Sequence, residues 1–290
     1  MLERTRLHRT PDPQGQATRG PRTLPDVLDW MWFSSTGRHL RHGLQAAADL
    51  MAPSWCVGCG AEGTDLCPEC TDDLRLLTRR PVAAEAGADA LPVIDVTDDD
   101  LRVLPVFAAG WYRTLVADVV VAFKEHERVG LRRVLAPALR RAMTTAADHL
   151  VPAGVPVVLL RPPPSLAAHV RRGRDPLDEL LQGALPVEGF TRGDHLITRR
   201  PVTEVATAVV GGASQKTRGS AARRQAHEQL QLAAGAQAQL ATTEVLLVDD
   251  VLTTGSTLRR LYELASAAGA HVCGAAVVAA TPRGDTPGQR

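Results

Sequence analysis

Apolar residues in this chain are spaced in two ways, and from about residue 103 onward the two spacings alternate. Short runs of Val, Leu and Ala without polar breaks predict buried strands, whereas apolar residues three or four positions apart predict amphipathic helices. The expected strands are 103–109, 155–160, 205–210, 245–248 and 271–280. The expected helices are 112–126, 131–150 with a kink or restart at Pro137, 175–185, and one that begins at Leu258. We therefore expect an α/β fold with a parallel sheet flanked by helices.

The flanking segments lack this alternation. Residues 1–50 form an N-terminal extension, whose first part is rich in Arg, Pro and Gly and is predicted to be disordered. Residues 79–102 contain Pro, Gly and three consecutive acids, Asp98 to Asp100, and predict a linker or a surface insertion. The expected organisation is this extension, a small cysteine-containing module at 51–78, the linker, an α/β domain at 103–280 and a tail at 281–290.

The stretch from Val245 to Leu258, VLLVDDVLTTGSTL, combines a strand, two acids and a loop that leads into a helix. Asp249 and Asp250 are expected at the carboxyl end of the strand, where ligands bind in open α/β sheets. The loop offers hydroxyls, a permissive glycine and the unpaired amides of a helix start, which together suit a phosphate. Its residues are Thr253, Thr254, Gly255, Ser256 and Thr257. Because the carboxylates suit sugar hydroxyls or a hydrated Mg²⁺, the stretch predicts a ribose 5-phosphate site.

Other interpretations of this stretch were weighed against that site. A P-loop would end in Gly-Lys-Ser/Thr, and the stretch contains no Lys. A response-regulator receiver domain also opens with a strand and an acidic pair, but that pair would lie near the start of a domain rather than close to the end of the chain. A plain strand-turn-helix, with Ser, Thr and Asp as ordinary caps, remains the alternative.

A second loop follows the strand expected at 155–160. It runs from Arg161 to Ser165 with the sequence RPPPS. If the sugar phosphate also carries a pyrophosphate, a second loop must hold it after a strand adjacent to the first, and this loop is the best candidate, with Arg161 and Ser165 as binding residues. Behind it lies a basic cluster that belongs either to the site or to a solvated helix end. The cluster consists of His169, Arg171, Arg172 and Arg174 around Gly173.

A third polar segment, residues 211–225, reads GGASQKTRGSAARRQ. Its glycines and cations suit either a mobile flap that closes over an anionic substrate or a surface loop without function. Lys216 in this segment is one of only two lysines in the chain. The other, Lys124, falls at the end of an expected helix, where the helix dipole favours a cation. The residues predicted to carry catalysis are Asp249, Asp250 and Lys216.

Four of the five cysteines form two C-x-x-C pairs within CVGCGAEGTDLCPEC. Cys56, Cys59, Cys67 and Cys70 offer the four thiolates that a tetrahedral Zn²⁺ site requires. Such a closed site has no open coordination position, so the zinc would be structural. Two disulfides are the alternative, but the paired spacing favours a metal. The fifth cysteine, Cys273, lies in an expected buried strand and is interpreted as an apolar core residue.

Charge and hydropathy exclude several classes of function. The 33 basic and 32 acidic residues give a net charge of +1, which makes no global case for binding membranes or for strong autonomous binding of nucleic acid. No apolar run approaches the roughly 20 residues that span a bilayer. The N-terminus lacks the apolar core of a secretory signal, and together with reduced cysteines this predicts a cytoplasmic protein.

The stretch around Asp249 and Asp250 resembles the PRPP-binding motif of the type I phosphoribosyltransferases, in which apolar residues, two acids and a TTGxT loop follow in that order. Together with the four-cysteine finger, the order of features from about Cys56 to Ala280 resembles the ComF family. Further matches are Tyr112, Phe123-Lys124, the Arg-Arg-Gly segment at 171–173, Gln215, Ser220 and Arg224. The chain departs from the family pattern at Arg161, at Arg174, where an aromatic is often found, and at Gln225 or Ala226, where Asn is common.

The resemblance implies a phosphoribosyltransferase-like protein associated with DNA uptake during competence. It further implies that Asp249 and Asp250 bind the ribose hydroxyls, and that the loop 253–257 binds the 5-phosphate of PRPP. Two functions are compatible with this. Either the protein is an enzyme that transfers the phosphoribosyl group, with Mg²⁺, to an unidentified nitrogen acceptor, or it is a non-catalytic partner of competence proteins that retains a PRPP pocket.

Overall fold

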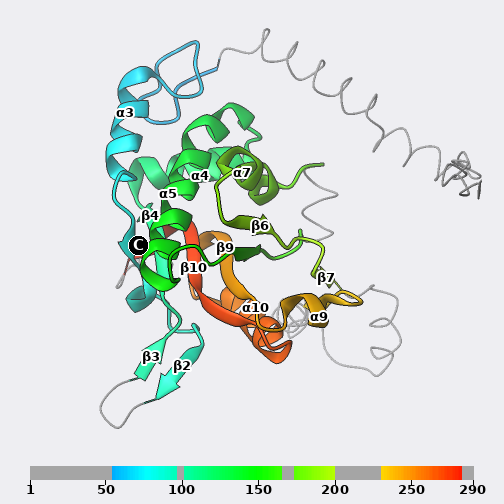
Figure 1. Ribbon diagram of the computed structural model, residues 1–290. Helices are drawn as coiled ribbons and strands as arrows, with labels where there is room; N and C mark the ends of the chain where they lie inside the picture. The colour runs from blue at the N-terminus through cyan, green and yellow to red at the C-terminus, as the bar shows by residue number, and fades with distance from the viewer. Residues whose placement is uncertain (1–53, 97–100, 165–172, 200–229, 283–290) are drawn as a thin grey trace, which may run out of the picture. The chain divides into compact units, whose positions relative to one another are not determined.

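A six-stranded sheet forms the centre of the part of the chain that the computed structural model describes, residues 54–96, 101–164, 173–199 and 230–282 (Figure 1). The strand order is β1-β4-β10-β9-β5-β6. All neighbours are parallel except β1, which pairs antiparallel with β4. The bounds are β1 Val82–Ala83, β4 Val106–Trp111, β10 His271–Ala280, β9 Glu244–Leu252, β5 Val157–Leu160 and β6 Phe190–Arg192. The fold class is thus the α/β class expected from the sequence.

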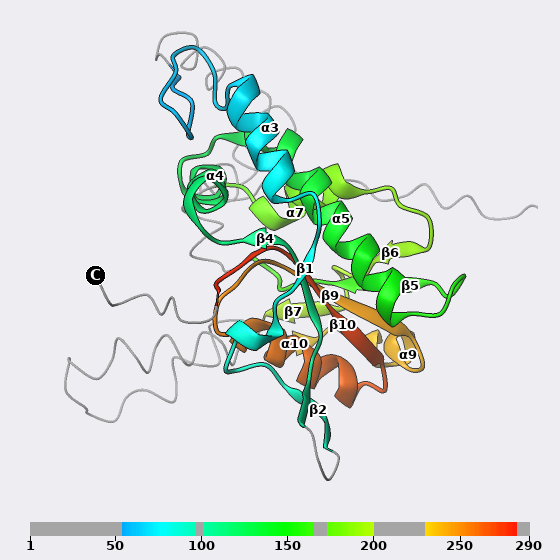
Figure 2. The same ribbon diagram turned by 90° about the vertical axis from the view of Figure 1, so that its left-hand side faces the viewer.

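Helices cover both faces of this sheet (Figure 2). One face packs on α4 Thr114–Glu125, α5 Arg132–Leu150 and α7 Pro176–Ala184, with Phe123, Leu139 and Leu180 among the fully buried side chains. The other packs on α9 Ala236–Leu240 and α10 Ser256–Ala267 through residues such as Leu240 and Leu261. With both faces covered, β9 and β10 are lined by Val, Leu and Ala, as parallel strands require.

The smaller elements complete the described part. They are the helix α3 Pro68–Leu77, the 3-10 turns η1 Glu85–Gly87 and η2 Val129–Leu131, the hairpin β2 Val93–Val96 with β3 Leu101–Val103, and the pair β7 Ile197–Arg199 with β8 Leu230–Leu232. The described residues from Trp55 onward form one compact unit. In these described ranges, no helix combines the length and apolar character needed to cross a bilayer.

The expected elements are found with shifted boundaries. The strand expected at 103–109 is β4, which begins only at Val106, because Leu101–Val103 pair with β2 and Pro105 interrupts the chain between them. The helix expected at 112–126 is α4, and the helix at 131–150 is α5, which continues through Pro137 without a restart. The predicted strand at 271–280 is confirmed as β10, and the strand predicted at 205–210 lies outside the described residues.

Residues 79–102, expected as a linker or insertion, contain both a surface hairpin and a strand of the main sheet. Strand β1 pairs with β4 at Val82↔Ala108, and Glu85 accepts a hydrogen bond from the amide of Val106 at 3.4 Å. Leu91 is 5% exposed and belongs to the core beneath α10. Part of this segment is therefore built into the α/β domain, and it also contacts the candidate site described below.

Candidate functional site

The candidate site lies at the ends of two neighbouring central strands, which are followed by helices on opposite faces of the sheet. Strand β9 lies between β10 and β5, and its partner β5 pairs with it only from Val157 to Leu160. The chain leaves β5 toward α7 on one face and leaves β9 toward α10 on the other (Figure 2). Such a switch point opens a crevice at the carboxyl ends of the strands. The two loops predicted to hold phosphate and pyrophosphate thus follow adjacent strands, as expected.

The loop after β9 forms the amino end of α10. Gly255 has φ +85°, a left-handed conformation that favours glycine, and it has no side chain that could cap the amides of the first helical turn. Thr253, Thr254 and Ser256 are exposed, with the hydroxyls of Thr254 and Ser256 3.3 Å apart. These hydroxyls and the amides of a twelve-residue helix can bind an anion together.

The segment between β1 and β2 supports this loop. The amide of Ala90 donates to the carbonyl of Thr254 at 2.8 Å. A Cβ on Gly255 would lie only 2.7 Å from Cδ2 of Leu91, so the glycine is required by packing as well as by its backbone angle. The sequence pattern did not indicate these contacts, because they join residues more than 160 positions apart in a segment without periodicity.

Asp249 and Asp250 lie near the carboxyl end of β9, three and two residues before its last residue, and the strand continues past the predicted end at Val248. The reason is that β10 continues alongside, pairing Val277 with Asp249 and Ala280 with Leu252, while β5 has already ended opposite Leu247. Both side chains turn back to the strand. Asp249 accepts from the amide of Asp250 at 2.9 Å, and Asp250 accepts from the amide of Val251 at 2.7 Å.

Lys124, at the end of α4, forms an ion pair with the second acid. Its Nζ lies 2.7 Å from Oδ2 of Asp250, with the two side chains 27% and 19% exposed. The sequence interpretation placed Lys124 only in the field of its helix dipole. Its rarity, as one of two lysines in the chain, was the available signal that it has a further role.

The two neighbouring carboxylates perturb each other. Burial raises the pKa of Asp249, and the negative charge of Asp250 raises it further, to about 7, although the Asp250 amide and Lys124 act in the opposite direction. Carboxylate oxygens are ligands that Mg²⁺ prefers, usually together with water and substrate phosphates. The donor set therefore fits a hydrated Mg²⁺ that arrives with a phosphorylated ligand.

Arg174 holds the end of α4 that carries Lys124. Its guanidinium stacks over the ring of Phe123, 4.5 Å from the centroid, and donates to the Phe123 carbonyl at 2.8 Å. Glu179 binds the other side of the guanidinium at 2.9 and 2.6 Å. Arg174 stands where the ComF pattern often has an aromatic, and here a cation–π contact occupies that position.

Arg161 points into a network of acids. It lies 2.7 Å from Asp194, 2.5 Å from Asp175 and 3.4 Å from Asp178, and it is 9% exposed. Arg192 binds two of the same acids. The network ties the ends of β5 and β6 to the start of α7. This geometry gives Arg161 a role in supporting the proline-rich loop, whereas its predicted contact with substrate stays a prediction.

Several predicted site residues lie outside the described residues. They are Ser165, the basic cluster from His169 to Arg172, Lys216 with its expected flap, and the matching residues Gln215, Ser220 and Arg224.

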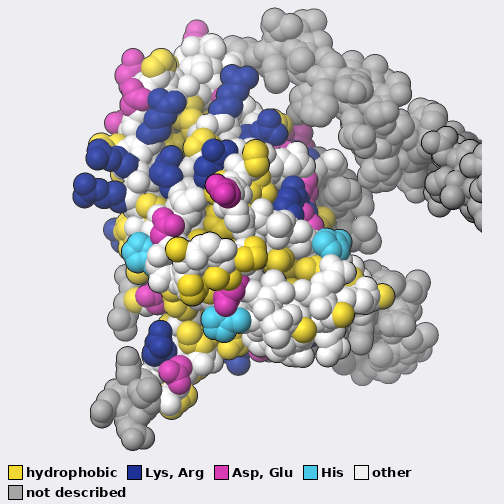
Figure 3. All heavy atoms as spheres, viewed as in Figure 1, with side chains coloured by type: hydrophobic (Ala, Val, Ile, Leu, Met, Phe, Trp, Pro, Cys, Tyr) yellow, Lys and Arg dark blue, Asp and Glu magenta, His cyan; other side chains and the backbone are white. Residues whose placement is uncertain are grey.

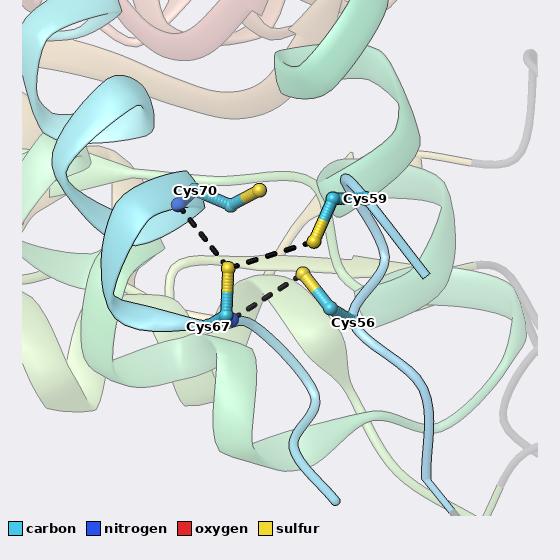
Figure 4. Close-up of side chains that lie close together, drawn as sticks. All are labelled: Cys56, Cys59, Cys67 and Cys70. Carbon is cyan, nitrogen blue, oxygen red and sulfur yellow. Dashed lines mark hydrogen bonds between the residues drawn. The ribbon is translucent and has the colours of Figure 1, made fainter. Parts of the chain in front are cut away.

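The four cysteines of the finger come together as predicted (Figure 4). Their Sγ atoms all lie within 4.8 Å of one another, and those of Cys59 and Cys67 are 3.7 Å apart. A tetrahedral site with Zn–S bonds of about 2.3 Å requires sulfur atoms about 3.8 Å apart, so the cluster fits zinc after small adjustments. The amide of Cys67 points to Sγ of Cys56 at 3.3 Å, and that of Cys70 to Sγ of Cys67 at 3.4 Å.

The thiols already differ in acidity without a metal. Burial alone would raise the pKa of Cys56, but backbone amides, that of Cys59 first, outweigh it and lower the pKa to about 6. The Cys67 side chain and burial raise the pKa of Cys70. Outside the cluster, burial raises the pKa of Cys273 to about 12, and its thiol donates to the Val245 carbonyl at 3.1 Å, which supports the interpretation of Cys273 as a core residue.

Positive charge is concentrated over α3 and α5, although the net charge is only +1 (Figure 3). Arg75, Arg79, Arg133 and Arg141 line a hollow of about 460 Å³ there. A larger hollow of about 620 Å³ lies near the start of β5, at the opposite end of that strand from the candidate site.

Comparison with known proteins agrees with the fold. The family model for the phosphoribosyl transferase domain matches residues 184–288, which include the two acids, the loop and α10. No curated protein matches the chain. The fold, the matched region and the four-cysteine cluster define a phosphoribosyltransferase-like α/β domain preceded by a candidate zinc finger. The ComF resemblance stays a prediction.

Proposed function

We propose that this protein binds PRPP or ribose 5-phosphate with Mg²⁺ and transfers the phosphoribosyl group to a nitrogen nucleophile. The observation that carries the proposal is the central strand β9, which presents Asp249 and Asp250 shortly before the amino end of α10, where the N-cap residue Gly255 has no side chain to cap the helix. The 5-phosphate binds the loop 253–257, and the acids accept hydrogen bonds from the ribose hydroxyls. The acids are assigned to the hydroxyls and the loop to the phosphate because carboxylates accept hydrogen bonds from hydroxyls and repel phosphate.

The reaction replaces one bond at the anomeric carbon with another. The C1–O bond to pyrophosphate breaks, the pyrophosphate leaves with the electron pair, a C1–N bond forms, and the nucleophile loses a proton to solvent. As positive charge develops on the sugar ring, the nearby Asp249 and Asp250 stabilise it electrostatically. Bound Mg²⁺ supplies charge neutralisation of the leaving pyrophosphate. In this proposal the flap with Lys216 closes over the pyrophosphate and excludes water.

Calorimetry with PRPP, with and without Mg²⁺, tests the proposal on the full chain and on an Asp249→Asn, Asp250→Asn variant. We expect Mg²⁺-dependent binding to the wild type and its loss in the variant, which should keep its urea-unfolding midpoint. Lys216→Ala should affect PRPP more than ribose 5-phosphate, since only PRPP carries the pyrophosphate. A wild type that binds neither ligand would refute the proposal.

Pyrophosphate release with ammonia and nitrogen bases then distinguishes an enzyme from a binding protein. Release that depends on one acceptor would identify the substrate class. Binding without release for any acceptor would restrict the proposal to a PRPP-binding protein.

A further inference from the structure

Lys124 is attached to the candidate site by an ion pair that joins two separate elements. Asp250 uses both oxygens, one accepting from the Val251 amide at 2.7 Å and the other paired with Lys124 Nζ at 2.7 Å. Neither side chain is more than 27% exposed, so solvent screens this pair less than it screens a surface pair. Lys124 and Asp250 therefore form a close, mostly buried ion pair at the candidate site.

The ammonium is held in place by the packing of α4. Arg174 contacts both the ring and the carbonyl of Phe123, the residue before Lys124, and the Phe123 side chain is fully buried. At the other end of α4, Leu115 packs against the cysteine cluster of the finger. Because both ends of this twelve-residue helix are anchored, Lys124 is held next to Asp250 with little freedom to move away.

An electrostatic problem explains why a cation is needed there. Two adjacent carboxylates directly precede a loop that is suited to phosphate, and their charge opposes any anionic ligand. One ammonium in direct contact offsets one of these charges. In β9 itself the residues next to the acids are apolar, so the compensating charge comes from another element.

We propose that Lys124 is a positioning residue of the ribose-phosphate site, whose ammonium orients Asp250 and offsets the acid pair so that a phosphorylated sugar can bind before Mg²⁺ does. This inference rests on the proposed function of the same site. It goes beyond that function by assigning a role to a helix that lies outside the matched phosphoribosyl transferase region, residues 184–288.

The test measures binding of inorganic phosphate and ribose 5-phosphate to the full chain in EDTA and in Mg²⁺. Lys124→Met should lower the affinity for both ligands by about fivefold or more in EDTA, as expected when one positive charge near an anion is lost. The loss should shrink in Mg²⁺ and at high salt. Lys124→Arg should stay within about threefold of the wild type, because it keeps the charge. Arg75→Met, which removes an exposed cation on α3, is the matched control and should leave the affinity for both ligands unchanged.

A second substitution distinguishes charge compensation from a merely structural role. Adding Asp250→Asn to Lys124→Met removes the charge that Lys124 balances, so phosphate binding should return to within about twofold of the wild type, a coupling expected of groups in contact. Lys124→Gln provides the same comparison if the methionine variant fails to fold.

The outcomes separate the two proposals. If the wild type binds ribose 5-phosphate and Lys124→Met binds as the wild type does, or if Asp250→Asn fails to restore phosphate binding, the role of Lys124 is refuted and the site stands. If the wild type binds neither ribose 5-phosphate nor PRPP, the proposed function fails, and the role of Lys124 fails with it.

Discussion

At the scale of single residues, Gly255 meets two steric demands. Its φ of +85° places it in the region that side chains avoid, and Leu91 occupies the space where a Cβ would lie. The first demand agrees with the loop sequence, since glycine adopts a positive φ about as readily as a negative one. The second depends on a segment far away in the chain, and only the folded structure reveals it.

We expect Gly255→Ala to lower the free energy of unfolding by about 2 kcal/mol, because the loop must shift away from Leu91. The same shift should lower the affinity for ribose 5-phosphate by at least about tenfold. Gly154→Ala is the matched control. Gly154 has φ +80° but no atom within 4 Å of its Cβ position, and it lies away from the loop. Urea unfolding and calorimetry on both variants measure the effects. Equal ligand affinities in the two variants would contradict the packing role of Leu91.

Asp249 should make stability depend on pH. Burial and Asp250 raise its pKa from 3.8 to about 7, so the folded chain binds more protons than the unfolded chain between about pH 4 and 7. The contribution of Asp249 to the free energy of unfolding therefore falls as pH rises through that window and levels off above it. Relative to the wild type, Asp249→Asn should gain about 2–3 kcal/mol of unfolding free energy between pH 5 and pH 8, since that interval covers about two units of the raised pKa at about 1.4 kcal/mol each. Urea unfolding at both values measures this gain, and a constant difference would argue against the raised pKa.

Residue identity and spacing were sufficient to predict that the acids come near the end of a strand, that a loop leads from them into a helix, and that the four cysteines come together, because each of these motifs is contiguous in sequence. The same information could not predict the partners of Lys124 and Arg161. Lys124 meets an acid 126 positions later, and Arg161 meets Asp194 across the end of β6. Such pairs depend on strand order and helix packing, which local patterns do not encode.

At the scale of elements, one charged network joins β5, β6 and α7. Asp175 caps α7 by accepting from the amide of Asp178 at 3.2 Å, with Pro176 in the first turn. The same Asp175 binds Arg161 at the end of β5. The start of the proline-rich loop is therefore positioned by the amino end of α7, a helix that the spacing of apolar residues predicted at 175–185.

Arg161→Met should lower the free energy of unfolding by about 3 kcal/mol, because Asp175 loses its cationic partner and Asp178 and Asp194 keep only Arg192. Arg259→Met on α10 is the control. Its exposed pair with Glu263 should contribute less than about 0.5 kcal/mol. Urea unfolding of both variants makes the comparison. An Arg161→Met protein as stable as the control, but unable to bind PRPP, would instead support direct contact with substrate.

At the scale of the whole described unit, the finger shares its interior with the α/β domain. Leu74 of α3 is buried in the core formed with α4 and α5, and Leu115 of α4 packs on the cysteine cluster. A Cβ on Gly58 would lie 2.7 Å from Sγ of Cys70 and 2.8 Å from Leu115. The sequence predicted the finger as a separate module, because contiguous cysteine spacing does not reveal which helix the module packs against.

Shared packing predicts that zinc stabilises the α/β domain as well as the finger. Purified protein should contain about one zinc per chain, and removal by a chelator should lower the melting temperature by at least about 5 °C in one cooperative transition. Cys59→Ser should lose the metal and melt like the chelated wild type, whereas Cys273→Ala, which changes the cysteine outside the cluster, should keep the zinc. Metal analysis and calorimetry check both expectations. Two separate transitions, with the upper one unaffected by the chelator, would show that the finger unfolds independently and leaves Lys124 in place without zinc.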